Sequence, residues 1–252
     1  MSESRRNRRN REREKRSKVT LSKLTFHQLD WLEYITVGLG LWFLFYPKPY
    51  DFLFTALLCM PIVGLLLNGL NGRPSIASLV EISVDTDGSD DYDVADFIDF
   101  AAWIILIRVL LDFEFESFYS LIIPGTIALA LMLIILFATH QLIDQSTKDR
   151  TWIYLSLISN VTLYSFAGTY GANCVYDHSE PTVYEAEVVD KRISTGSKGR
   201  KTYYVKVTPW GHHYDKEEIS VGSSQYERIQ VGQSVKIDLK EGLFNIPWYY
   251  IE

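Results

Sequence analysis

Cysteine is scarce in this chain, and the short motifs that mark many enzymes are missing. The 252 residues include two cysteines, Cys59 and Cys174, which excludes a disulfide scaffold. The sequence has no phosphate-binding P-loop, no G-x-S-x-G nucleophile motif, no H-E-x-x-H zinc motif and no C-x-x-C pair. We therefore assign no catalytic residue, expect neither a cofactor nor a bound metal, and do not favour an enzyme.

Charged residues are also scarce over long stretches between residues 31 and 170. A bilayer core of about 30 Å requires roughly 20 helical residues, and a helix is the default spanning structure. Four runs fit this length: 31–46, 52–70, 118–138 and 152–170. A shorter run, 97–111, contains Asp99 and Arg108 and is predicted to span as well. The predicted fold is a membrane α-helical bundle of about five transmembrane helices, or of four if 97–111 is a re-entrant or surface segment.

Basic residues are concentrated at the start of the chain. Residues 1–18 hold nine Arg or Lys against three Glu, although the whole chain has a net charge of −6. This basic tail has almost no apolar residues and is predicted to be disordered. The positive-inside rule keeps it in the cytoplasm. Five spans then place the C-terminal region outside the inner (plasma) membrane, whereas four spans would place it inside.

Residues 177–252 are predicted to form a small all-β barrel domain, separate from the transmembrane region 19–176. Five alternating runs, separated by turn residues, predict strands at 182–193, 201–208, 216–221, 234–239 and 246–251, with a helical turn at 223–229. OB-like and SH3-like barrels both fit this order. The expected core comprises Val183, Ala186, Val188, Tyr203, Val205, Val207, Ile219, Val235, Ile237, Leu239 and Trp248.

Four stretches of this region carry a resemblance: 186–192 (AEVVDKR), 196–200 (GSKGR), 203–205 (YYV) and 231–235 (VGQSV). Together they resemble small β-barrel domains of unknown function that are tethered to bacterial multi-pass membrane helices. The resemblance covers under a third of the chain and rests on turn glycines and core positions. The last residues, 245–251 (NIPWYYI), depart from the closing pattern of that family. The resemblance implies a barrel architecture and a bacterial origin, but no activity.

Three polar residues within the predicted spans are candidates for a polar pathway: Asp99, Arg108 and Asn160. Arg108 precedes Asp112 by four residues, so the two can pair on one helix face. The alternative role for such residues is hydrogen bonding between helices. A pathway of this kind would serve an ion or a small solute.

Two charged clusters are further candidates. Five basic residues near a hairpin, Lys191, Arg192, Lys198, Arg200 and Lys201, would contact lipid headgroups or another polyanion, or else form a solvated hairpin. Three acidic residues, Asp85, Asp87 and Asp90, are weak candidates for a hard cation such as calcium. Their spacing does not fit an EF-hand, and the alternative is a solvated acidic loop.

These features favour a multi-pass membrane protein that anchors a small β-barrel interaction domain at the membrane surface. The expected partners are the lipid bilayer and a protein bound through the C-terminal domain, and a homo-oligomer is compatible with the sequence. Nucleic acid is not expected, because no aromatic platform lies beside the basic tail. The alternative function is a subunit of a transporter or channel that uses the intramembrane polar residues.

Overall fold

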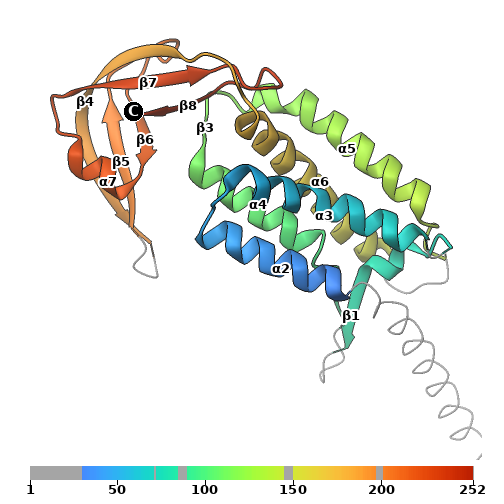
Figure 1. Cartoon of the computed structure of the whole chain (residues 1–252). Coiled ribbons are helices and arrows are strands. Elements are labelled where there is room, and N and C mark those ends of the chain that lie inside the picture. The colour runs from blue at the N-terminus through green and yellow to red at the C-terminus, as the bar shows by residue number, and fades with distance from the viewer. Residues whose placement is uncertain (1–29, 71, 85–89, 145–149, 197–200, 252) are drawn as a thin grey trace, which may run out of the picture. The chain divides into compact units, whose positions relative to one another are not determined.

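The computed structural model describes residues 30–70, 72–84, 90–144, 150–196 and 201–251 (Figure 1). Two compact units divide the chain. The first takes its described residues from Met1–Leu106 and Ile127–Gly168, and the second from Ile107–Thr126 and Thr169–Glu252. Helices α4 (Asp99–Asp112), α5 (Tyr119–Thr139) and α6 (Arg150–Val175) contribute residues to both units.

The first unit is mainly helical. It contains α2 (Asp30–Phe45), α3 (Tyr50–Leu70), the 3-10 turn η1 (Ile76–Leu79) and an antiparallel hairpin of β1 (Val80–Val84) and β2 (Asp90–Val94), besides parts of α4, α5 and α6. Its core consists of fully buried aliphatic and aromatic side chains such as Leu32, Phe54, Leu57, Phe97 and Leu157. Gly64 lets α3 approach the Phe97 ring, because any Cβ at this position would overlap that ring.

The predicted bundle of five, or four, transmembrane helices is wrong. Helices form over all five apolar runs, but among the described helices only α3 and α5 are both long and apolar enough to cross a membrane. Helices α2 and α4 have 16 and 14 residues, or about 24 and 21 Å at 1.5 Å per residue, which is shorter than the hydrocarbon core. Helix α6 has 26 residues but carries many Ser, Thr, Asn and Gly residues.

The second unit contains a nearly closed, barrel-like sheet of six antiparallel strands in the order β3-β8-β7-β4-β5-β6. The strands are β3 (Glu114–Phe115), β4 (Thr182–Thr195), β5 (Lys201–Val207), β6 (Glu217–Val221), β7 (Ser234–Lys240) and β8 (Trp248–Ile251), with a helical turn α7 (Ser223–Arg228) between β6 and β7. The five strands and the turn expected from the sequence are confirmed, to within two residues at each end. Strand β3 was not expected.

Strand β4 is long because it belongs to two pairings. Its first part, from Thr182 to Glu187, pairs with β7, and its second part, from Val188 onward, pairs with β5. The register shifts between Val188 and Asp190. Such a bulge bends and twists a strand, and this curvature helps the sheet to curl toward closure.

The barrel core is formed by the side chains on one face of these strands, because successive side chains of a strand point to opposite faces. The buried cluster comprises Ala186, Val188, Val205, Val207, Trp210, Ile219, Ile229, Val235, Ile237, Tyr249 and Ile251. The expectation was wrong for Val183, whose side chain is 52% exposed. The inward residues of β4 are Ala186 and Val188, so alternation turns Val183 to the other face. Trp248 is buried, but outside this cluster, where it packs edge-on against Phe113.

Candidate functional site

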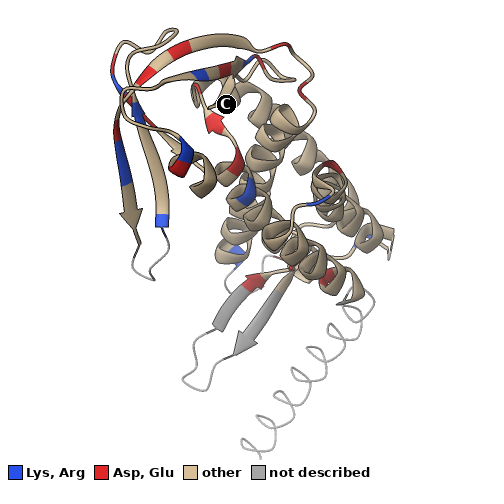
Figure 2. Cartoon of the chain, turned by 60° about the vertical axis from the view of Figure 1, so that its left-hand side comes forward, with Lys and Arg blue, Asp and Glu red and all other residues tan. Residues whose placement is uncertain are grey.

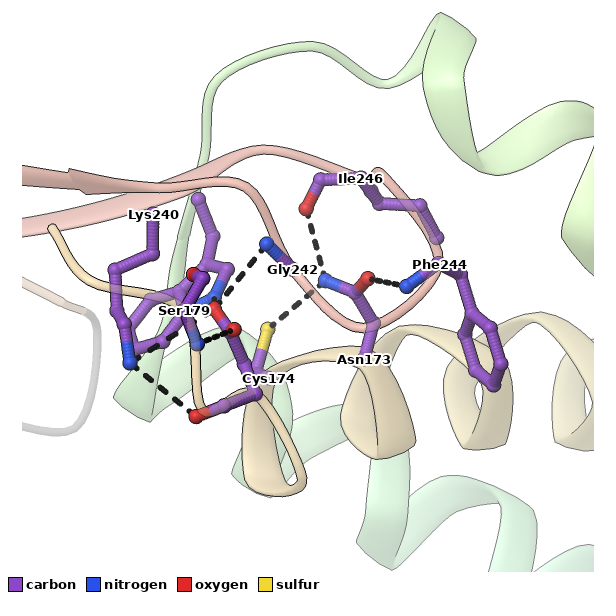
Figure 3. Close-up of polar contacts among 9 residues, drawn as sticks. Asn173, Cys174, Ser179, Lys240, Gly242, Phe244 and Ile246 are labelled. Carbon is purple, nitrogen blue, oxygen red and sulfur yellow. Dashed lines mark hydrogen bonds and ion pairs between the residues drawn. The ribbon is translucent and has the colours of Figure 1, made fainter. Parts of the chain in front are cut away.

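The β7–β8 turn, residues 241–247, is hydrogen-bonded to the C-terminal end of α6. A helix leaves its last carbonyl groups without partners inside the helix, so other chain segments can bond to them. Here the backbone N–H of Leu243 donates to the carbonyl of Asn173 over 3.1 Å. Figure 3 shows the polar contacts of this site, which we call the α6–turn junction.

Asn173 makes the central contacts of the junction. Its Nδ2 donates to the carbonyl of Ile246 at 2.8 Å, and its Oδ1 accepts from the backbone N–H of Phe244 at 2.8 Å (Figure 3). The side chain is fully buried, so its polar atoms depend on these partners. It also lies against the buried thiol of Cys174, with Nδ2 3.9 Å from Sγ.

Asp177 holds the other side of the junction. Its Oδ2 accepts from the backbone N–H of Gly242 at 3.1 Å and from Trp248 Nε1 at 2.9 Å, and its Oδ1 accepts from the backbone N–H of Ser179 at 2.7 Å. Lys240 Nζ lies 3.9 Å from Oδ2. Burial opposes ionisation, but the hydrogen bonds and the ammonium group outweigh it and lower the pKa of Asp177 below its ordinary value. The junction therefore uses this carboxylate as an anchor.

A second polar cluster bridges the two edges of the sheet, between β3 and β6. The imidazole of His213 lies between two carboxylates, with Nε2 2.7 Å from Glu116 Oε2 and Nδ1 3.2 Å from Glu217 Oε2. Glu217 also accepts hydrogen bonds from Tyr249 Oη at 2.9 Å and from Trp210 Nε1 at 3.2 Å. We call these five residues the seam cluster.

Glu114 adds a further carboxylate beside the seam cluster. Burial raises the pKa of Glu114, and the nearby carboxylate of Glu217 raises it further, whereas the backbone of Ser220 in β6 opposes the shift. Strands β3 and β6 are the first and last strands in the sheet order. Within the described part of the chain, no three His, Cys, Asp or Glu side chains are arranged to hold a metal ion. The cluster is best explained as closing the barrel.

The three polar candidates from the sequence occupy different places. Asp99 begins α4, where its Oδ1 accepts from the backbone N–H of Phe100 at 2.6 Å. Burial, with a contribution from Asp93, raises the pKa of Asp99 to about 7. Arg108 pairs with Asp112 at 2.7 Å, as their spacing indicated. Asn160 is a half-buried residue of α6. Asp99 and Asn160 belong to the first unit and Arg108 to the second.

Figure 2 marks the Lys and Arg residues of the chain in blue, including those on the barrel strands. Two residues of the basic hairpin have partners within the barrel. Lys191 Nζ donates to the carbonyls of Tyr226 and Ile229 beside α7, and Arg192 pairs with Glu218 at 2.7 Å. Lys201 is exposed at the start of β5. Lys198 and Arg200 lie outside the described residues, and so do Asp85 and Asp87 of the acidic cluster. Asp90 is the first residue of β2.

Sequence reasoning missed the residues that make both sites. Asn173 and Asp177 follow an apolar run, and polar residues at the end of such a run are a weak signal for a capping role. The pair of Glu116 and His213 has no such signal, because 97 residues separate them. Comparison of the chain with protein-family models, with curated proteins and with solved structures gave no match.

Proposed function

We propose that this chain is a membrane-anchored protein that holds its barrel at the membrane surface as a domain for binding another protein. The observation that carries the proposal is the surface of α5. Seven of its large apolar or aromatic side chains are exposed: Tyr119, Ile122, Ile123, Ile127, Leu131, Ile134 and Phe137. Water does not favour so large an apolar surface, whereas lipid does.

The core helix of a soluble protein can be as long and as apolar as α5, but such a helix would be mostly buried. Only 22% of the apolar stretch of α5 is buried, and 39% of that of α3. The hydroxyls of α5 also suit lipid, because Thr126 and Thr139 donate to carbonyls four residues earlier, at 2.6 and 2.7 Å. A helix that satisfies its polar atoms internally avoids a large cost of burial in hydrocarbon.

Strand pairing constrains the path of such a chain across the membrane. Strand β3 ends at Phe115, three residues short of α5, and pairs with β8, with Phe115 opposite Trp248. Residues 115 and 248 must therefore lie on the same side. If α5 crosses the bilayer, the chain must cross back before β4, and α6 is the described helix long enough to do so.

The polar composition of α6 is compatible with crossing beside other helices. Its Thr162 and Ser165 hydroxyls donate to the carbonyls of Ile158 and Val161, each at 2.7 Å. Its buried side chains include Ile153, Leu157 and Val161, so only part of the helix surface would meet lipid. In membranes, helices with small and hydroxyl residues pack closely against neighbouring helices.

This path predicts on which side of the membrane the barrel lies. With α3 as the one crossing before β3, the barrel lies opposite the N-terminus. The basic tail at residues 1–18 keeps the N-terminus in the cytoplasm, so we propose an extracytoplasmic barrel.

The membrane anchoring and the extracytoplasmic position of the barrel are tested together, on the full chain carrying Val231→Cys in a Cys59→Ser background. We expect the chain to stay in the membrane fraction after a high-pH carbonate wash. A membrane-impermeant maleimide should label residue 231, which is exposed, in right-side-out vesicles and not in inverted ones. Release by carbonate would contradict membrane anchoring, and labelling only in inverted vesicles would contradict the orientation.

The partner-binding part rests on exposed apolar side chains of the barrel, among them Val183, Ile193 and Tyr214. Tyr214 is 88% exposed, on the loop between β5 and β6. A photo-crosslinking residue placed there in living cells should give one adduct of defined mass, and the same residue at Lys201, at the other end of β5, serves as the matched control. If residue 214 gives no discrete adduct, or if the control at residue 201 gives the same adduct, the interaction role fails.

A further inference from the structure

The β7–β8 turn presents two large apolar side chains to solvent. Leu243 is 50% exposed and Phe244 is 43% exposed. Figure 3 shows the Phe244 ring directed away from the polar contacts of the junction. The turn is tight, with positive φ angles at Gly242 and Asn245. The shape of the turn therefore holds the side chains of Leu243 and Phe244 at the outer surface of the turn.

The turn lies between the chain segments that lead into α5 and out of α6. Asn173, near the end of α6, bonds to the backbone of Leu243, Phe244 and Ile246. On the other side, the backbone N–H of Glu116, three residues before α5, donates to the carbonyl of Pro247 over 3.2 Å. All of these residues belong to the second unit.

The apolar surface of the turn has a counterpart at the start of α5. Phe118, Tyr119, Ile122 and Ile123 are exposed in the same unit. Aromatic residues at the ends of spanning helices mark the level of the membrane–water interface. A turn held beside that level would bring Leu243 and Phe244 to the lipid surface.

We infer that Leu243 and Phe244 insert into the bilayer interface beside the start of α5 and so hold the barrel against the membrane. The occupant of this surface is the boundary between phospholipid headgroups and acyl chains. This inference rests on the proposed membrane anchoring. Recognition is apolar rather than ionic, because Glu241, the first residue of the turn, is exposed and acidic, and Lys240 contacts Asp177. Insertion should therefore not require anionic lipid.

The test places single cysteines in the full chain, in a Cys59→Ser background. An environment-sensitive fluorophore is attached after Leu243→Cys, Phe244→Cys, Leu131→Cys or Val231→Cys, and each protein is reconstituted into phosphatidylcholine vesicles that contain lipid with a nitroxide on carbon 5 or carbon 12. Leu131 near the middle of α5 is the deep reference, and exposed Val231 between α7 and β7 is the solvent reference. Interfacial side chains lie about 5–10 Å below the headgroup boundary.

We expect labels at 243 and 244 to be quenched about twofold more strongly by the shallow nitroxide than by the deep one, as befits an interfacial depth. The label at 131 should show the reverse order, and the label at 231 should not be quenched. Adding phosphatidylglycerol should leave these values unchanged.

The outcomes separate the two proposals. If 131 is quenched while 243 and 244 behave like 231, the inserted turn is refuted and the membrane anchoring stands. If quenching at 243 and 244 appears only with phosphatidylglycerol, apolar insertion is refuted. If 131 is not quenched at all, membrane anchoring fails, and the inference with it.

Discussion

Asp177→Ala is expected to destabilise the barrel by about 3–5 kcal/mol, the range for removing one partner of a buried, hydrogen-bonded charge. The change leaves the N–H groups of Gly242 and Trp248 without an acceptor in a buried place. Asp177 itself is 8% exposed, so water cannot easily replace the carboxylate. The free energy of unfolding, measured on the detergent-solubilised full chain by tryptophan fluorescence in denaturant, reports the loss.

Asp215→Ala is the matched control, because Asp215 is an exposed aspartate of the same unit. It should change the free energy of unfolding by no more than about 0.5 kcal/mol. Equal effects of the two substitutions would show that the junction does not depend on Asp177.

Acidification gives an independent readout of the same anchor. Because the pKa of Asp177 is lowered in the folded protein from a reference value of 3.8, its ionised form stabilises the fold above that reference value. This stabilisation is lost as the pH falls through the folded-state pKa. The difference between the wild type and Asp177→Asn should therefore shrink at acidic pH.

Gly242→Ala is the second substitution with a large expected effect. Gly242 has a φ of +77°, and a Cβ there would lie 2.5 Å from the carbonyl oxygen of Ile246 and overlap the Asn173 amide. The turn cannot move away without breaking its bonds to Asn173. We expect a loss of about 3 kcal/mol or more, from backbone strain of about 1–2 kcal/mol and from overpacking of about 1–3 kcal/mol.

Gly232→Ala separates these two causes. Gly232 has a φ of +86°, but nothing lies within 4 Å of its would-be Cβ. Its substitution should cost only the backbone strain, about 1–2 kcal/mol. If both alanine variants unfold at the same denaturant concentration, close packing of the turn on α6 contributes nothing.

Local patterns in the sequence were sufficient for the barrel strands. Residues such as Val205 and Val207 alternate with outward residues, and glycines mark the turns, so strand positions depend on neighbours in the chain. The apolar runs likewise placed the helices. Their role could not be derived from hydropathy alone, because α4 ends at Asp112 after 14 residues, too early to cross.

Strand β3 illustrates what local patterns cannot show. Glu114 and Phe115 form a strand only because Trp248 and Tyr249 supply its partners from the far end of the chain. Two residues have too little propensity to signal a strand by themselves. The same holds for His213, whose carboxylate neighbour Glu116 comes from a segment 97 residues away.

By itself, the sequence determined where the apolar helices and five of the six strands of the barrel lie, and that Arg108 and Asp112, four residues apart, would pair. Only the tertiary structure decided which polar residues are anchors. Asn173 and Asp177 acquire that role because folding brings the β7–β8 turn, about 70 residues later in the chain, against the end of α6. The physical reason is that a buried hydrogen bond needs two partners in one place, and only folding of the whole chain brings distant partners together.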